Sequence, residues 1–154
     1  MHDDHPLAQD LGFLLSRASG VFAKTASEAL APLGLRVRSY SVLAFASDEK
    51  AGVTQRRLAE LVGLDPSQVV ALVDELEASG LVKRVTDPTD RRSKLVSATT
   101  KGSRVRGEGG RRIAEAQGGI MADVSPETRA ELNALLRQLV FPKAQQTRTG
   151  ERIT

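Results

Sequence analysis

Apolar residues recur every three or four positions along the first part of the chain. This spacing is typical of an amphipathic helix that keeps one apolar stripe. The stripe comprises Leu11, Leu14, Leu15, Ala18, Phe22, Ala26 and Ala29. Pro32 and Gly34 predict where this helix ends. A second, shorter helix is predicted for residues 39–46, and residues 48–52 read as a turn.

Two further short helices are predicted on either side of a tight turn. Thr54 suits the N-cap of the first, which buries Leu58, Leu61 and Val62, and Gly63 ends it. The second begins with a cap at Asp65, a proline at the first helical position and a capping-box glutamine, Gln68. Its inner face carries Val69, Leu72, Val73 and Leu76, and Gly80 ends it. Two helices joined in this way predict a helix-turn-helix motif.

After Gly80 the pattern changes to that of a β-hairpin. Residues 81–85 and 94–97 read as strands, and residues 87–90 read as the turn between them. The hairpin has a long basic tip. Such a hairpin directly after a helix-turn-helix predicts a wing.

The remaining chain predicts two more helices. Thr99 or Thr100 caps a helix that reaches Ala122, although six glycines fall inside it and each costs about 1 kcal/mol against alanine. This helix therefore either kinks or needs packing against a partner. Ser125 and Pro126 begin the last helix, whose apolar stripe is Leu132, Leu135, Leu136, Leu139 and Val140, and Pro142 ends it.

Composition narrows the classes of protein and site. The 154 residues include no cysteine, which excludes disulfides, thiolate metal sites and a thiol redox switch. Aromatic residues make up only 3%, so a core of leucine, valine and alanine in packed helices is favoured. No apolar run approaches the roughly 20 residues of a membrane helix, and the acidic start lacks the basic end of a signal peptide. The prediction is a cytoplasmic protein without a membrane partner.

Charge is unevenly distributed. The segment 81–112 carries a net charge of +7, against +3 for the whole chain. A local excess of lysine and arginine is the electrostatic footprint expected for a phosphate backbone. A solvated charged face is the alternative reading.

These segments together resemble the MarR family of bacterial transcription regulators over nearly the whole chain. The most specific match runs from Asp87 through the Asp-x-Arg pair Asp90 and Arg92 to Gly102. Residues 53–59 resemble the first helix of the family's helix-turn-helix, and residues 72–82 resemble the end of its recognition helix with the entry to the wing.

The resemblance implies a mainly α fold, a winged helix-turn-helix of about six helices plus a β-hairpin wing. It assigns residues 1–34 to an N-terminal dimerisation helix, 35–99 to the DNA-binding domain, 100–145 to C-terminal dimerisation helices and 146–154 to a polar tail. It further implies a homodimer on near-palindromic double-stranded DNA and, in many members, a small-molecule effector.

The outward N-terminal face of a recognition helix reads base edges. Here this face carries Ser67, Gln68, Val70 and Ala71. Gln68 suits adenine, but it is equally suited to capping its own helix. Family members often have a hydroxyl and a basic residue where this chain has Val70 and Ala71, so weight shifts to the wing.

By the family match, Arg92 enters the minor groove with Asp90 bracing it, and Arg91 and Lys94 meet phosphates. A plain surface arginine is the alternative for Arg92. At the start of the first helix-turn-helix helix, Gln55, Arg56 and Arg57 are placed to hold phosphate. The alternative for Arg57 is an ion pair with Glu60.

A ligand pocket is suggested by Phe13, Arg17, Tyr40 and Phe45 on the helices that wall the family's cleft. An arginine and a phenol among aromatics suit a small aromatic or phenolic ligand, and ordinary packing is the alternative. No residue pattern predicts a catalytic site, a metal or a cofactor.

The sequence therefore predicts a non-enzymatic, sequence-specific DNA-binding regulator, usually a repressor in this family. The alternative is a winged-helix architectural or protein-interaction module that binds nucleic acid without specificity.

Overall fold

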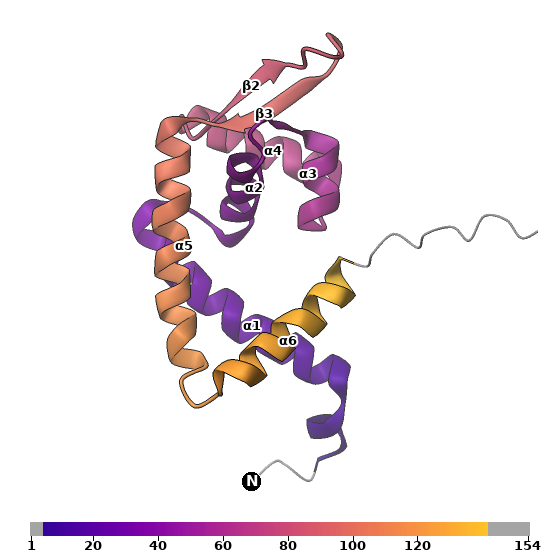
Figure 1. The fold of residues 1–154 in the computed structure, drawn as a ribbon, viewed down its shortest axis with the longest axis vertical. Coiled ribbons are helices and arrows are strands. Elements are labelled where there is room, and N and C mark those ends of the chain that lie inside the picture. The colour runs from indigo at the N-terminus through magenta and orange to yellow at the C-terminus, as the bar shows by residue number, and fades with distance from the viewer. Residues whose placement is uncertain (1–4, 142–154) are drawn as a thin grey trace, which may run out of the picture. The chain divides into compact units, whose positions relative to one another are not determined.

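The computed structural model describes residues 5–141, which form six α-helices, two 3-10 helices and a three-stranded antiparallel sheet (Figure 1). The helices are η1 (Pro6–Gln9), α1 (Leu11–Leu30), η2 (Ala31–Leu33), α2 (Val37–Asp48), α3 (Gln55–Val62), α4 (Pro66–Ala78), α5 (Thr100–Ile120) and α6 (Pro126–Val140). The strands are β1 (Val53–Thr54), β2 (Val82–Thr86) and β3 (Lys94–Ala98). This confirms the predicted mainly α fold. The chain divides into two compact units, Met1–Gly118 and Gly119–Thr154.

Helix α1 is the long amphipathic helix that the apolar spacing predicts. The Asp10 carboxylate caps it by accepting a 2.7 Å hydrogen bond from the amide of Phe13. Of its residues only Ala26 and Leu30 are buried. Large apolar side chains in its first half, including Leu11, stay exposed. Within the first unit, α1 therefore contributes to the core only at its C-terminal end.

Helix α2 lies at the centre of the first unit, in contact with α1, α3, α4 and β3. It begins two residues before and ends two residues after the predicted 39–46. Its buried positions are Ser39, Val42, Leu43 and Ala46. The core around them is built from leucine and valine of every neighbouring element: Leu30, Leu58, Val69, Val73, Leu76, Val82 and Val96. This composition is what the scarcity of aromatic residues predicts.

The helix-turn-helix is formed by α3 and α4 where the local signals place it. The Thr54 hydroxyl caps α3 by accepting a 3.2 Å hydrogen bond from the amide of Arg57. Gly63 ends α3 at a φ of +66°, a left-handed conformation that glycine adopts without strain. Pro66 is the first residue of α4, directly after its N-cap Asp65. Both helix boundaries were therefore readable from local sequence.

Strand β3 is the middle of the sheet, with β1 on one side and β2 on the other. The β2–β3 hairpin is the predicted wing, and Figure 1 shows it extending beyond the helices of the DNA-binding motif. Strand β1 was not predicted. It pairs Val53 with Val96 and Thr54 with Leu95, so the strand exists because a distant segment supplies its hydrogen bonds.

Helix α5 is continuous through Gly102, Gly107, Gly109 and Gly110. A Cβ at Gly102 would lie 1.9 Å from the carbonyl oxygen of Leu81, and one at Gly109 would lie 2.7 Å from the Tyr40 ring. These two glycines let the helix backbone approach the core closely. A Cβ at Gly107 meets nothing within 4 Å. The helix is therefore unbroken, and Gly102 and Gly109 pack against the chain's own core. Packing of this helix against a partner stays a prediction. The helix ends at Ile120, two residues before the predicted Ala122.

Helix α6 forms most of the described part of the second unit. The Ser125 hydroxyl caps it by accepting from the amide of Thr128 at 3.1 Å. Four residues of its predicted apolar stripe are exposed, and Leu136 is half-buried: the exposed ones are Leu132, Leu135, Leu139 and Val140. The predicted stop at Pro142 and the tail 146–154 lie outside the described residues. No helix among residues 5–141 is both long and apolar enough to cross a membrane.

Candidate nucleic-acid interface

Helix α4 presents the predicted base-reading face to solvent. Ser67, Gln68, Val70 and Ala71 are all exposed, while Val69 between them is fully buried. Helix α4 is amphipathic, and the burial of its apolar stripe determines which side chains point outward. What it offers to a base pair is one hydroxyl, one amide and two apolar groups.

The amide of Gln68 has a partial internal partner. Its Oε1 accepts a hydrogen bond from the backbone amide of Asp65 at 3.4 Å, the capping interaction foreseen as an alternative. That bond is long and occupies only the oxygen. The Nε2 group keeps its two donors, so capping and donation to a base are compatible at this residue.

The start of α3 carries less free charge than its sequence suggests. Arg56 Nε lies 3.7 Å from Glu60 Oε1, and Arg57 Nη1 lies 3.1 Å from Glu60 Oε2. Both arginines remain largely exposed, so one shared carboxylate screens them in part. Gln55 is half-buried, and its Oε1 accepts a 2.9 Å hydrogen bond from Arg84 Nε.

The wing tip is shaped by two aspartates that bond to the backbone just ahead of them. The Asp87 carboxylate accepts from the Thr89 amide at 2.8 Å and from the Thr89 hydroxyl at 2.6 Å. These hydrogen bonds from Thr89 stabilise the carboxylate and lower the pKa of Asp87 below its usual 3.8. Asp90 accepts from the amide of Arg92 at 3.0 Å and from the Ser93 hydroxyl at 3.1 Å.

This arrangement specifies how Asp90 braces Arg92. The contact is made through the Arg92 backbone, and the guanidinium is not part of it. Arg91 and Arg92 are both exposed on the turn that Asp90 holds. Lys94 donates from Nζ to the Thr86 hydroxyl across the hairpin at 2.8 Å, which leaves its charge uncompensated. The tip therefore presents three cations on an internally bonded loop.

The sequence analysis counted Arg84 only as part of the basic segment 81–112 and predicted no role for it. It lies on β2 with its side chain only 22% exposed, and it forms ion pairs with Asp74 and Glu77 of α4. Partial burial alone would lower the pKa of Arg84, but the hydrogen bonds to Asp74 and Glu77 outweigh it and raise that pKa. Two sequence features could have indicated its role. Asp74 and Glu77 lie three positions apart on α4, and the alternation of β2 places Arg84 on the face that is turned toward the helices.

The basic segment 81–112 is thus partly neutralised. Besides Arg84, Arg106 forms an ion pair with Asp48 at 2.9 Å, and Arg112 forms one with Glu108 at 2.9 Å. The uncompensated charge concentrates at the wing tip and on the outer face of α5. The sequence predicted the positive net charge of this segment but not which of its cations are neutralised by ion pairs.

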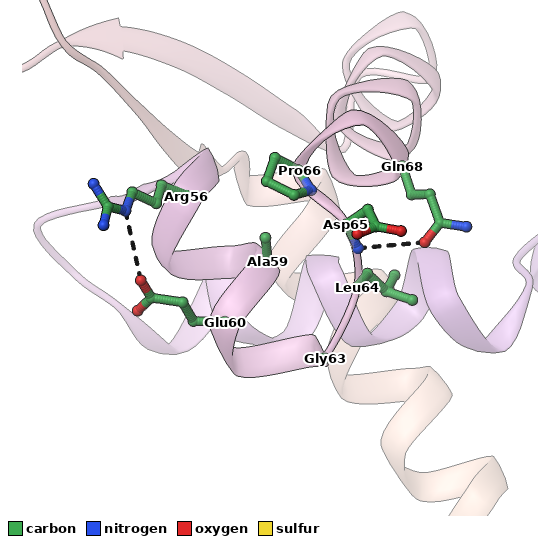
Figure 2. A pocket seen from close by; sticks show the side chains of 8 residues that line it. All are labelled: Arg56, Ala59, Glu60, Gly63, Leu64, Asp65, Pro66 and Gln68. Atoms are coloured by element: carbon green, nitrogen blue, oxygen red, sulfur yellow. Dashed lines mark hydrogen bonds and ion pairs between the residues drawn. The ribbon is translucent and has the colours of Figure 1, made fainter. Parts of the chain in front are cut away.

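A pocket of about 470 Å³ lies between α3 and α4 at the helix-turn-helix turn (Figure 2). Figure 2 shows Arg56 paired with Glu60 on one side and Gln68 capping at Asp65 on the other. The pocket is a hollow in the same surface that carries the predicted DNA contacts. None of the four residues predicted to bind a ligand lines it.

The predicted ligand residues differ in their surroundings. Phe13 and Arg17 are exposed on α1. Phe45 packs against the hydrophobic core, and so does Tyr40, whose hydroxyl donates to the backbone oxygen of Arg106 at 3.3 Å. Burial, with the charge of Asp48, raises the pKa of Tyr40 above its ordinary 10.0. Packing accounts for Tyr40 and Phe45, while the two α1 side chains have no such account within the described residues.

Comparisons with known proteins agree with this geometry. A family model described as MarR family matches residues 33–93. A MarR-family transcriptional regulator from Rhodococcus sp. RHA1 is 44% identical with a TM-score of 0.86, over 91% of this chain and all of that one. CouR from Rhodococcus jostii RHA1, solved with p-coumaroyl-CoA, is 42% identical with a TM-score of 0.83, over 92% of this chain and 99% of that one. A transcriptional repressor CouR bound to a 23-mer DNA duplex is 27% identical with a TM-score of 0.79, over 88% of this chain and 95% of that one.

Proposed function

Since the chain belongs to the MarR family of transcriptional regulators, we propose that it is a homodimeric repressor that binds a near-palindromic operator and releases it on binding an aromatic effector. The observation that carries this proposal is the pair of exposed arginines at an internally braced wing tip, together with an exposed N-terminal face of α4. We further propose that the chain binds DNA without catalysis and does so in the cytoplasm.

The proposal divides DNA contacts between the helix and the wing. Ser67 and Gln68 meet base edges in the major groove, and Val70 and Ala71 contact thymine methyl groups. Arg92 enters the minor groove, where a narrow, electronegative groove favours arginine. The remaining cations near this surface hold phosphates and set the register of the protein on the duplex: Arg56, Arg57, Arg91 and Lys94.

Dimerisation is supported by apolar side chains that stay exposed within residues 5–141. Leu11, Leu14 and Leu15 of α1, and Leu135 and Leu139 of α6, are exposed leucines on two different helices. Several exposed large apolar side chains on one helix are typical of an interface. We assign residues 1–34 and 100–145 to the dimer and 35–99 to DNA. Two recognition helices about 34 Å apart would then meet successive major grooves.

The effector is proposed from the relative at 42% identity. That protein was solved with p-coumaroyl-CoA, the thioester of a phenolic acid. We therefore propose a phenolic aromatic ligand for this chain, with its CoA thioester as the first form to test. The ligand would bind a conformation with a different helix spacing more tightly and so lower DNA affinity by that difference.

The test is a binding titration with DNA from upstream of the gene, at physiological salt, with unrelated duplex as competitor. We expect operator affinity to exceed non-specific affinity by about 10³ or more, and p-coumaroyl-CoA to dissociate the complex. Steep salt dependence without any sequence preference would instead support the non-specific architectural module, which the apolar pair Val70 and Ala71 keeps in consideration.

Arg92→Ala should weaken operator binding more than Arg111→Ala, an equal change of charge on the outer face of α5. The reason is that Arg92 lies on the braced tip whereas Arg111 lies on a helix outside the DNA-reading elements. Loss of one base-specific contact should cost about 1–3 kcal/mol. Equal effects of the two substitutions would remove the wing from this account.

A further inference from the structure

Arg84 differs from the preceding cation of β2, Lys83, in the direction of its side chain. Its Cα partner across the sheet is Val96 of β3, which is fully buried. Paired residues of an antiparallel ladder point to the same face, so Arg84 points with Val96 toward the helices. By contrast, the preceding residue on β2, Lys83, is exposed.

The guanidinium of Arg84 joins three elements through three different nitrogens. Nε donates to Gln55 Oε1 at the start of α3, Nη2 donates to Asp74 Oδ1 of α4 at 2.5 Å, and Nη1 donates to Glu77 Oε2. The backbone amide of Arg84 adds a 3.0 Å bond to the other oxygen of Glu77. One strand position is thereby tied to both helices of the helix-turn-helix.

Arg84 also occupies the critical place along the strand. Val82, two residues earlier, is in the core, while Thr86, two residues later, is exposed. Of the three inward-facing positions of β2, Arg84 is therefore the outermost that the helices hold. The wing beyond it carries Arg91 and Arg92, and the angle of the wing relative to α4 depends on what fixes the strand at this point.

We propose that Arg84 is a positioning residue for DNA recognition, which fixes the wing at the angle to α4 that lets wing tip and recognition helix meet adjacent grooves together. This inference rests on the proposed DNA-binding function. Arg84 does not touch DNA in this account. It acts through Asp74, Glu77 and Gln55.

Charge separates this role from that of a phosphate ligand. Arg84 faces two carboxylates, so it supplies no free positive charge to the surface. Asp74 and Glu77 belong to the recognition helix, where an unpaired carboxylate near the phosphate backbone repels DNA. On simple charge grounds, removing Asp74 should strengthen binding. If Asp74 positions the wing through Arg84, removing it should weaken binding.

The experiment measures operator and non-specific DNA affinity of the full chain for Arg84→Met, Arg84→Lys and Asp74→Asn. Lys83→Met is the matched control, with the same charge change on the same strand. We expect Arg84→Met to lose operator affinity by about tenfold or more, because a partly buried network is left with unpaired acids. Lys83→Met should lose about threefold or less, as expected of a dispensable surface cation. Asp74→Asn should also weaken operator binding, and Arg84→Lys should recover part of the loss.

A double substitution distinguishes positioning from general stability. If Arg84 sets the wing angle, Arg92→Ala should cost much less in the Arg84→Met background than in the wild type, since the tip contact is already lost. Thermal unfolding of each variant confirms that it is folded at the assay temperature. If Arg84→Met does not fold, Arg84→Lys and Asp74→Asn carry the test.

Three results would overturn the inference. The first is equal operator affinity of Arg84→Met and Lys83→Met. The second is stronger binding by Asp74→Asn. The third is independent losses from Arg84→Met and Arg92→Ala, with a salt slope reduced by about one, which would make Arg84 a direct phosphate contact. A wild-type chain without operator selectivity would refute the proposed function itself, whereas a selective wild type with any of these three results refutes only the role of Arg84.

Discussion

The arginines of this chain differ in exposure and in ion pairing, and the residue type alone does not predict these differences. Arg92 is exposed on the wing tip, Arg84 is held by two acids of α4, and Arg106 pairs with Asp48. The sequence predicted the turn that carries Arg92, because the residues that form this turn are neighbours along the chain. It could not place Arg84, because Gln55 and Asp74 are 29 and 10 residues away along the chain.

Tyr40 gives a prediction that one spectroscopic signal can test. It is the sole tyrosine and there is no tryptophan, so the alkaline rise of absorbance near 295 nm reports Tyr40 alone. Burial raises its pKa, and the carboxylate of Asp48 adds to this against the opposing charge of Arg106. We expect a midpoint above 10.0 in the folded protein. Asp48→Asn should lower the midpoint, and a midpoint at or below the value in urea would contradict the packing described here.

The same shift has a consequence for stability. The folded protein keeps the Tyr40 phenol neutral over a wider pH range than the unfolded chain does. Its contribution is therefore fully present below pH 10 and is lost as the pH rises through the folded pKa. The free energy of unfolding should fall in that alkaline window, and Tyr40→Phe should reduce the fall.

Individual helices and strands divide into those set by local sequence and those set by distant contacts. Asp65 and Pro66 begin α4, and Gly63 ends α3, as their residue types predict. Strand β1 was missed because two residues carry no periodicity, and its pairing with Val96 is made across the fold. The sequence analysis treated the glycines of α5 only as destabilising. Gly102 and Gly109 are needed because a Cβ there would collide with Leu81 and Tyr40.

The glycines of α5 therefore predict opposite responses to one substitution. Gly107→Ala should stabilise the protein by about 0.5–1 kcal/mol, because the position is helical, exposed and free of neighbours within 4 Å. Gly102→Ala should destabilise it by about 1–3 kcal/mol, because the added methyl meets the carbonyl of Leu81. Urea unfolding of the two variants measures both. Stabilisation by both substitutions would show that helix propensity alone governs α5, and destabilisation by both would contradict the open space at Gly107.

The wing tip predicts that an aspartate close to DNA supports binding. Asp90→Ala removes a negative charge, yet it should weaken operator affinity by about 1 kcal/mol or more, because the turn that presents Arg92 loses two hydrogen bonds. Asp90→Asn is the control, since its amide oxygen can still accept from the Arg92 backbone. Tighter binding by Asp90→Ala would mean that charge outweighs the shape of the turn.

At the scale of the whole molecule, apolar positions on α1 and α6 stay exposed among the described residues. Apolar positions on α1 and α6 were predicted from their spacing, but spacing cannot say whether a stripe faces its own core or a second copy. Leu11 is 67% exposed and Leu139 is 61% exposed, so neither side chain is buried in the core of its own unit. None of the exposed leucines of α1 and α6 belongs to the hydrophobic core of the first unit.

We predict that Leu135→Glu shifts the protein from dimer to monomer, because a carboxylate would be buried in the proposed interface. Gln138→Glu is the matched control on the same helix, with the same added charge at an exposed polar position. Light scattering after size-exclusion chromatography measures the mass. Operator affinity should fall with dimer content. A dimeric Leu135→Glu protein would place the interface away from this stripe.

The turn of the wing, residues 87–93, is held by hydrogen bonds between its own residues, including the backbone bond in which Asp87 donates to Ser93 at 3.0 Å. The turn therefore keeps its shape through local bonds alone. It connects the ends of β2 and β3, where Thr86 pairs with Lys94. Its residues can mutate without disturbing the hydrophobic core, and core mutations need not alter its conformation. Descendants of such a protein could acquire new operator preferences through a handful of surface substitutions while inheriting the remainder of the fold unchanged.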